Sequence, residues 1–198
     1  MYTPKKFTRT TVPKGQSEKA LTIHEDKLYV GYVNKKNEVE EALKNVDPSS
    51  GNITYSAIRS LKDAETFAAN GVYLHEHYFE IIDGDGVAPT GALLQEIEKE
   101  FGSFEKFLGL LTGCGMAARG WVVFGFDTHE KRIKLFIGDA HNQGGVWGTI
   151  PLLVLDVYEH AYFMDYGADR KAYLADFLQS VNWGKVAKKF EQVSILSI

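Results

Sequence analysis

The most constraining feature of the sequence is an apolar run that ends in an acid and, four residues later, a histidine. Residues 152–155 lead directly into Asp156 and then into His160. An ionised carboxylate is costly to bury unless it is paired or bound to a metal. Asp156 and His160 offer one oxygen and one nitrogen to a single cation, and so indicate half of a metal site. An aspartate that caps the following turn, beside a satisfied core histidine, is an equally simple interpretation.

Composition and charge are those of an ordinary globular protein. Of the 198 residues, 44% are hydrophobic and 24% are charged, enough for one good core or two small ones that pack closely. The formal net charge is -4 and no basic cluster with interleaved aromatics is present, so we expect no nucleic-acid partner. No apolar run has the length of a signal peptide core or a membrane span. We therefore expect a cytoplasmic protein without membrane contact.

Cysteine and histidine usage limits the kind of metal site. Cys114 is the single cysteine, so neither an internal disulfide nor a CxxC thiolate site is possible. Any metal must be bound through nitrogen and oxygen. The histidines available for this are His24, His75, His77, His129, His141 and His160.

The first part of the sequence predicts helices. Helical spacing of apolar residues predicts one long helix over residues 17–43. A turn cluster follows at residues 47–52, and further helical segments are predicted at residues 55–67 and 71–82. We therefore expect a helical hairpin with an insert.

A glycine-rich stretch closed by a proline, residues 83–89, is the clearest linker. It ends just before Thr90, a predicted helix N-cap. We place a domain boundary here, which gives an N-terminal helical hairpin domain over residues 1–84 and a C-terminal domain over residues 85–198.

Helices and strands segregate along this second part. Residues 121–126 and 133–137 are β-rich runs joined by a polar turn, which predicts an antiparallel hairpin, and residues 151–155 predict a third strand. The segregation indicates an α+β fold of helices around a small three-stranded antiparallel sheet. The predicted helices cover residues 93–101 and 104–111, with Ser103 as a cap, and parts of residues 159–190.

The segment from Asp156 to Tyr162 reads Asp-Val-Tyr-Glu-His-Ala-Tyr. It resembles the signature of the iron/manganese superoxide dismutases, in which an aspartate, any residue and an aromatic residue precede Glu-His-Ala and a second aromatic residue. The resemblance covers most of the chain from about Asp85 onward, and the first part more loosely. It implies a superoxide dismutase that converts superoxide to oxygen and hydrogen peroxide at one Fe or Mn ion per chain.

The resemblance also implies the metal ligands. His24, in the predicted first helix, resembles the first ligand of the family, and Tyr32, eight residues later, resembles the tyrosine that guards access to the metal. Three imidazoles and one carboxylate suit iron or manganese better than a closed structural zinc site, and they leave a fifth position for solvent. The implied ligands are His24, His75, Asp156 and His160.

The second ligand has two candidates. His75-Glu76-His77-Tyr78-Phe79 matches a family string of a histidine, two further residues and two aromatic residues when His75 is the ligand, and His77 is the alternative. Without the family, a strand-borne His-x-His pair of a hydrolase is another interpretation, but on a helix the two side chains point apart. We predict that His75 is the ligand.

Residues beside the metal are implied in the same way. In the family, a glutamine or histidine hydrogen-bonds the metal-bound solvent and contacts the gateway tyrosine. His141 fits the distance to Asp156 better than Gln143 does, so we predict this role for His141, although a surface histidine in a polar loop is nearly as simple an interpretation. Trp121 resembles the tryptophan that walls the pocket, and we expect His129 to be exposed and uninvolved.

Glu159 resembles the glutamate that, in family dimers, reaches a metal ligand of the other subunit, which implies a homodimer. Leu28 and Phe163 stand where the family has a histidine and a tyrosine that hydrogen-bond across the interface. Both partners are apolar together, so neither leaves an unpaired polar group. Tyr158 stands where a tryptophan is usual.

Two alternatives to a superoxide dismutase remain open. The first is a catalytically altered family member with a metal-binding or structural role, which only the departures at Leu28, Tyr29 and Phe163 favour. The second is a non-haem iron oxygenase, because two histidines and a carboxylate with open positions also describe those enzymes. The sequence shows no anchoring motif for a cosubstrate, which disfavours the second alternative.

Overall fold

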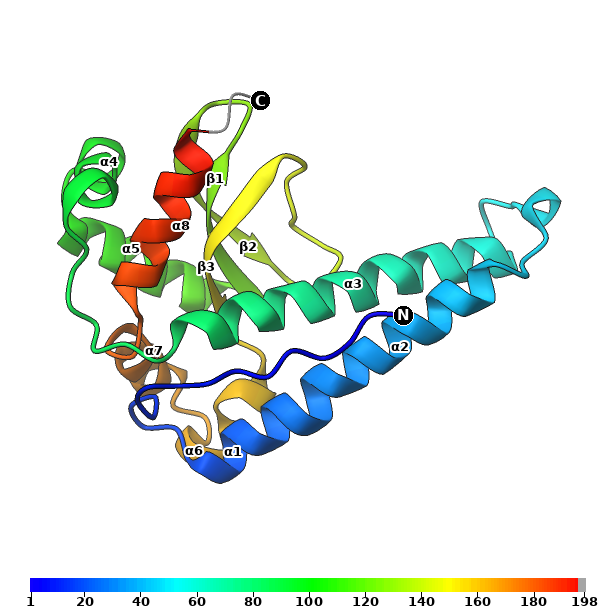
Figure 1. The fold of residues 1–198 in the computed structure, drawn as a ribbon, viewed down its shortest axis with the longest axis horizontal. Helices are drawn as coiled ribbons and strands as arrows, with labels where there is room; N and C mark the ends of the chain where they lie inside the picture. Colours follow the sequence, from blue (N-terminus) through cyan, green and yellow to red (C-terminus); the bar gives the residue numbers. More distant parts are fainter. Residues whose placement is uncertain (196–198) are drawn as a thin grey trace.

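The structure, a computed structural model, describes residues 1–195. Its first half is dominated by a long helical hairpin that projects from the rest of the molecule (Figure 1). The first arm consists of α1 (Glu18–Ile23), a turn of π-helix (His24–Tyr29) and α2 (Val30–Leu43). The single regular helix predicted over residues 17–43 is therefore wrong in one respect, because a wider turn interrupts it.

The second arm is one continuous helix, α3 (Ala57–Ile81), so the break predicted between residues 67 and 71 is absent. The N-terminal end is capped by Ser56, whose hydroxyl accepts a hydrogen bond from the amide of Arg59 at 3.2 Å. The helix continues because Ala68, Gly71 and Val72 are buried in the hairpin, where packing outweighs the weak helix propensity of glycine. A short 3-10 turn (Pro48–Ser50) lies in the connection at the hairpin tip.

The predicted linker has no regular structure and leads into α4 (Gly91–Phe101) and α5 (Phe104–Ala117). Thr90 occupies the N-cap position of α4, but its side chain makes no capping hydrogen bond, so the predicted capping interaction is wrong. Ser103 caps α5 as predicted, accepting a hydrogen bond from the amide of Lys106 at 3.1 Å.

Three antiparallel strands form a sheet in the order β2-β1-β3, which confirms the predicted α+β fold. The strands are β1 (Trp121–Asp127), β2 (Arg132–Gly138) and β3 (Thr149–Asp156). Trp121 pairs with Gly138 on one side and with Asp156 on the other. The register therefore places Trp121, at the start of the central strand, beside the acid that ends β3.

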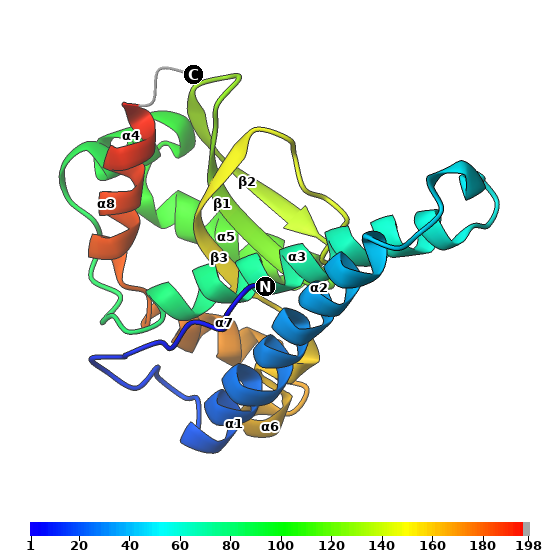
Figure 2. The ribbon, with the colours of Figure 1, turned by 45° about the vertical axis from the view of Figure 1, so that its right-hand side comes forward.

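The chain closes with a 3-10 turn (Glu159–Ala161) and three helices, α6 (Phe163–Tyr166), α7 (Arg170–Leu178) and α8 (Trp183–Ser194). Helix α4 contacts β2 and α8 contacts β1 and β3, and Figure 2 shows both helices on the side of the molecule away from the tip of the helical hairpin. The turn at residues 159–161 follows β3 after only two residues, which keeps His160 close to Asp156.

One hydrophobic core joins the two parts of the chain, running from Leu21 in α1 to Val193 in α8. Helix α3 packs directly against β3. The division into domains of residues 1–84 and 85–198 stays a prediction. Within residues 1–195, no helix combines the length and the apolar character needed to cross a membrane.

Candidate metal centre

Four side chains from four elements of the fold converge at one point. One comes from the π turn, one from α3, one from the end of β3 and one from the turn that follows it. Each offers one donor atom, and these atoms all lie within 4.8 Å of one another. The four residues are His24, His75, Asp156 and His160.

The three histidine Nε2 atoms surround one carboxylate oxygen. Oδ2 of Asp156 lies 3.2 Å from Nε2 of His24, 3.6 Å from that of His75 and 3.1 Å from that of His160. Donor atoms bound to one ion at about 2.1 Å are separated from one another by roughly 3 to 4 Å. The spacing is therefore that of the ligand shell of a single cation.

His75 is held in one orientation by its own helix. Its Nδ1 donates a hydrogen bond to the carbonyl of Gly71, one turn earlier in α3. A neutral imidazole has only one N–H, so Nε2 of His75 carries a lone pair towards Asp156. Two lone pairs facing each other in a buried site repel unless a cation lies between them.

Burial sets the protonation of the cluster. His24, His75 and Asp156 are 2%, 0% and 0% exposed. Burial is the main cause that lowers the pKa of His24, and it lowers the pKa of His75 to about 3. For Asp156, burial favours the neutral acid, but the charge and hydrogen bond of His160, together with the nearby His24, hold its pKa well below the usual range. Burial thus favours neutral imidazoles at His24 and His75 beside an ionised carboxylate, the forms that bind a metal. Burial also acts to lower the pKa of His160, but the charge and hydrogen bond of Asp156 outweigh it and raise that pKa.

Two atoms of the cluster have no hydrogen-bond partner among residues 1–195, namely Nε2 of His24 and Nε2 of His75. A buried polar atom without a partner costs about 1–3 kcal/mol, so two of them at one point need a reason. A metal ion with a preference for nitrogen and oxygen donors satisfies both atoms. The residues present therefore fit an ion such as Fe or Mn.

Tyr32 lies over the cluster on the first arm of the hairpin. Its ring centroid is 5.3 Å from that of His75 and 4.6 Å from that of His141. Eight residues of α-helix would place His24 and Tyr32 about 80° apart, and the π turn, with more residues per turn, reduces this angle. A Cβ added at Gly71 would lie 2.7 Å from Cδ1 of Tyr32, so the glycine allows the ring to approach α3.

His141 lies next to Tyr32, and Trp121 lies next to His75. Nε1 of Trp121 donates a hydrogen bond to Nδ1 of His141 at 2.9 Å. A neutral His141 therefore carries its proton on Nε2, and burial lowers its pKa to about 4. His141 is 4% exposed, whereas Gln143, the alternative for this position, is exposed in the loop.

The remaining histidines lie outside the cluster. Nδ1 of His77 is 3.1 Å from Nζ of Lys189 on α8, on a different side of α3 from His75. His129 is exposed in the turn between β1 and β2. The structure thus brings together the four sequence-predicted ligands, and it places Tyr32 and His141 beside them.

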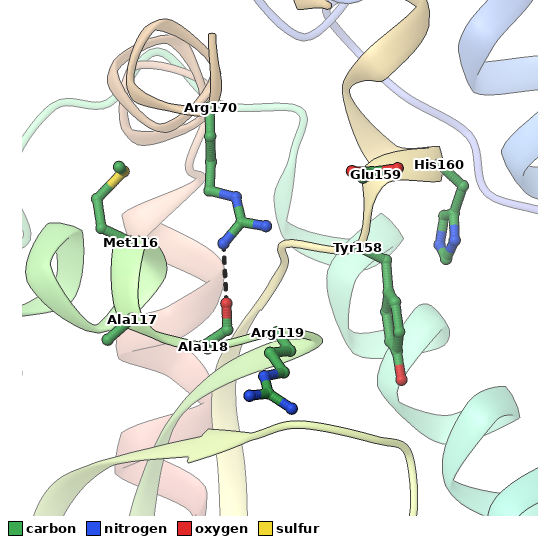
Figure 3. A pocket seen from close by; sticks show the side chains of 8 residues that line it. All are labelled: Met116, Ala117, Ala118, Arg119, Tyr158, Glu159, His160 and Arg170. Atoms are coloured by element: carbon green, nitrogen blue, oxygen red, sulfur yellow. Dashed lines mark hydrogen bonds between the residues drawn. The ribbon is translucent and has the colours of Figure 1, made fainter. Parts of the chain in front are cut away.

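The cluster approaches the surface at His160, whose side chain is 25% exposed. The ring of His160 stacks on Tyr158, and both residues line a surface pocket with Glu159 and two arginines, Arg119 and Arg170 (Figure 3). The guanidinium of Arg170 is held by the carbonyl of Ala118 at 2.8 Å. The pocket therefore combines two positive charges and one carboxylate beside the exposed edge of His160.

Sequence reasoning missed two parts of the site. The carbonyl of Gly71 orients His75, and the hydroxyl of Tyr173 donates a hydrogen bond to the backbone carbonyl of Asp156 at 2.7 Å. A glycine four residues before a helical histidine is the only sequence signal for the first contact. The second joins residues on separate elements, so it carries no local signal.

Comparison with known proteins identifies the class to which this fold and site belong. The model of the C-terminal domain of iron/manganese superoxide dismutases matches residues 89–189. The superoxide dismutase [Fe] of Aquifex pyrophilus is 38% identical over 193 residues, which cover 96% of this chain and 91% of the relative. The superoxide dismutase [Mn] of Haloarcula marismortui is 36% identical over 178 residues, covering 89% and 86%.

The matches extend over both the helical hairpin and the sheet, and they include relatives named for each metal. The chain belongs to the iron/manganese superoxide dismutase family. The predicted family resemblance is therefore confirmed.

Proposed function

We propose that the protein is a superoxide dismutase, which converts two superoxide anions and two protons to oxygen and hydrogen peroxide. The observation that carries the proposal is the buried cluster of three imidazoles and one carboxylate, in which two Nε2 atoms lack a partner among the described residues. The names of the relatives support the same activity.

His24, His75, Asp156 and His160 would bind one Fe or Mn ion per chain. When bound, such an ion supplies one-electron redox chemistry, because it is stable in both the +2 and +3 states. The amide of Tyr158 donates a hydrogen bond to Oδ1 of Asp156 at 2.9 Å, which leaves Oδ2 for the metal. Relatives named for iron and for manganese are about equally similar, so the proposal covers both metals.

We assign the handling of protons to Tyr32 and His141. Their rings meet edge to face at 4.6 Å above the cluster. Trp121 donates to Nδ1 of His141, so the Nε2–H of the neutral ring can donate a hydrogen bond and orient a proton-carrying partner. Burial, together with the charge of Asp156, raises the pKa of Tyr32, so its hydroxyl keeps its proton at neutral pH.

We further propose a homodimer formed through the surface around Glu159. Glu159 is exposed beside the ligand His160, and the neighbouring Phe163 and Met164 are 55% and 50% exposed. Exposed apolar side chains next to a charged group are typical of the core and rim of an interface. Sedimentation of the wild type should give the mass of a dimer, and Glu159→Ala should shift it towards the monomer.

The activity is tested by loading the purified protein separately with Fe and with Mn, measuring bound metal by mass spectrometry and following superoxide consumption. We expect one ion per chain and turnover with at least one metal. Bound metal without turnover would instead favour the altered, non-catalytic family member. A protein that bound neither metal and consumed no superoxide would contradict the proposal.

A further inference from the structure

An N-terminal strap, defined as residues 2–16, runs along the two arms of the helical hairpin and between them in Figure 1 (dark blue). Its first residue is clamped to α2, because Asn37 accepts a hydrogen bond from the amide of Tyr2 at 2.6 Å and donates one to its carbonyl at 2.8 Å. At the other end, Gln16 donates a hydrogen bond to the hydroxyl of Tyr78 at 2.7 Å. One end of the strap is therefore hydrogen-bonded to α2 and the other end to α3.

Beneath the strap lies a buried carboxylate that the proposed chemistry does not use. Glu76, next to His75 on α3, is 4% exposed. Its Oε1 accepts a hydrogen bond from the hydroxyl of Tyr29 at 2.9 Å, and the hydroxyl of Tyr2 lies 2.9 Å and 3.1 Å from its two oxygens. Nζ of Lys5 is 2.6 Å from Oε2. The carboxylate thus has three donors, two of them from the strap.

Tyr29 connects this carboxylate to the π turn. It is fully buried and is the last residue of the turn that begins at His24. Its hydroxyl donates to Glu76 and accepts from the backbone amide of Lys5 at 2.8 Å. The end of the turn opposite His24 is therefore held by two hydrogen bonds to other elements.

The strap makes two more contacts with the same turn. Arg9 forms an ion pair with Glu25, the residue after His24. Phe7 packs edge to face on Tyr29, with ring centroids 5.6 Å apart. Turns of π-helix are rare and depend on their surroundings, because they form less readily than the α-helix on either side. The strap and Glu76 contact the Tyr29 end of this turn, whereas rings of α3 and His160 pack against His24.

We propose that Glu76 is a positioning residue, which locks the strap onto Tyr29 and so holds the π turn in the shape that points Nε2 of His24 into the metal cluster. The inference rests on the proposed function in so far as the cluster binds a metal. The hydrogen bond between Tyr29 and Glu76, at the end of the turn opposite His24, would then determine how tightly His24 holds the ion.

The test compares Glu76→Gln with a matched control, Glu80→Gln. Glu80 lies one turn later on α3 and pairs with Lys5 at 3.5 Å and with Lys189 at 2.9 Å. The hydroxyl of Tyr29 donates to Glu76 and, among residues 1–195, makes no hydrogen bond to Glu80. We expect Glu76→Gln to release metal to a chelator about tenfold faster than the wild type, because it weakens charge-assisted hydrogen bonds. Glu80→Gln should release metal at the wild-type rate, and only Glu76→Gln should change the electron paramagnetic resonance spectrum of the Mn-loaded protein.

A second variant, Tyr29→Phe, removes the connecting hydroxyl and keeps the ring. It should accelerate metal release by a similar factor, and the double variant should be no faster than either single one, because both changes break one connection. Equal release rates for Glu76→Gln and the wild type, or for Glu76→Gln and Glu80→Gln, would overturn the inference. So would a double variant whose effect is the product of the two single effects.

Hydrogen exchange of the metal-free protein separates this inference from the proposed function. The amides of residues 24–29 should exchange faster in Glu76→Gln than in Glu80→Gln, whether or not the cluster supports superoxide turnover. Unchanged exchange in that turn would contradict the positioning role, while an inactive wild type would contradict only the proposed function.

Discussion

Nε2 of His24 and Oδ2 of Asp156 lie 3.2 Å apart, although one residue comes from the first arm of the helical hairpin and the other ends the last strand of the sheet. A metal held between these atoms would link the two parts of the chain directly. Because no such site exists in the unfolded chain, binding free energy adds to folding stability.

His160 is the most exposed of the four proposed ligands. His160→Ala removes one donor from the cluster, and since loss of even an outer partner of a ligand costs about 10–100-fold in affinity, we expect a loss of about 100-fold or more in metal affinity, together with loss of turnover. Metal analysis and superoxide consumption measure the two effects. His129→Ala is the matched control, because His129 is exposed and outside the cluster. Full activity in the His160 variant would refute the assignment.

Tyr32→Phe separates metal binding from proton handling. The ring keeps its contacts with His75 and His141, so bound metal should stay at the wild-type level. Loss of the hydroxyl should lower turnover by about tenfold, within the usual contribution of a positioned proton donor. Tyr55→Phe, at a tyrosine that is 79% exposed, serves as the control. Loss of metal in the Tyr32 variant would mean that the tyrosine has a different role.

Gly71→Ala tests the close approach of Tyr32 to α3. The new methyl group would lie 2.7 Å from Cδ1 of that ring, which forces a shift and should destabilise the fold by about 1–3 kcal/mol. Gly109→Ala is the matched helical control, because its Cβ would meet nothing within 4 Å, and we expect it to be neutral or stabilising by up to about 1 kcal/mol. Chemical denaturation measures both changes. Equal effects at the two positions would contradict the argument.

The carboxylate of Asp83 joins the predicted linker to α8 and makes a pH-dependent contribution to folding stability. Asp83 accepts hydrogen bonds from Nζ of Lys185 at 2.7 Å and from Nδ2 of Asn182 at 3.1 Å. Burial favours the neutral acid, but these contacts outweigh it and lower the pKa of Asp83 below the ordinary 3.8. The folded state thus binds this proton less readily than the unfolded state, so the stabilisation is complete above about pH 4 and disappears as the pH falls through the lower folded pKa.

Asp83→Asn should therefore cost about 1–2 kcal/mol of unfolding free energy at pH 7. The difference from the wild type should shrink as the pH falls below 3.8. Asp85→Asn, at an exposed acid in the same segment, should change stability little at either pH. Denaturation curves at pH 7 and pH 3 check this, and a difference that grows towards pH 3 would contradict the sign of the argument.

The strands and the proximity of Asp156 to His160 were predictable, because each depends on neighbouring residues. Asp156 and His160 are four residues apart at the end of an apolar strand, and β1 to β3 lie within two residues of the predicted ranges at each end. Sequence spacing did not decide between His75 and His77, since both lie in one helix. Their surroundings differ only in three dimensions, where His77 meets Lys189 and His75 meets Asp156.

The π turn and the continuity of α3 were not predictable by pattern. A wider turn in a helix changes which residues face the core. Here Tyr29 and Val33 are buried, while Leu28 and Tyr32 are only partly buried. That shift is visible only once the strap and α3 are in place. Gly71 suggested a break, yet it is the residue that lets the two arms approach each other.

The most direct test of the account is anomalous diffraction from crystals of the loaded protein, recorded at the iron and manganese absorption edges. The account predicts one peak per chain, bound by Nε2 of His24, His75 and His160 and by Oδ2 of Asp156. A peak bound by His77, or a metal site elsewhere in the molecule with these four side chains empty, would contradict it.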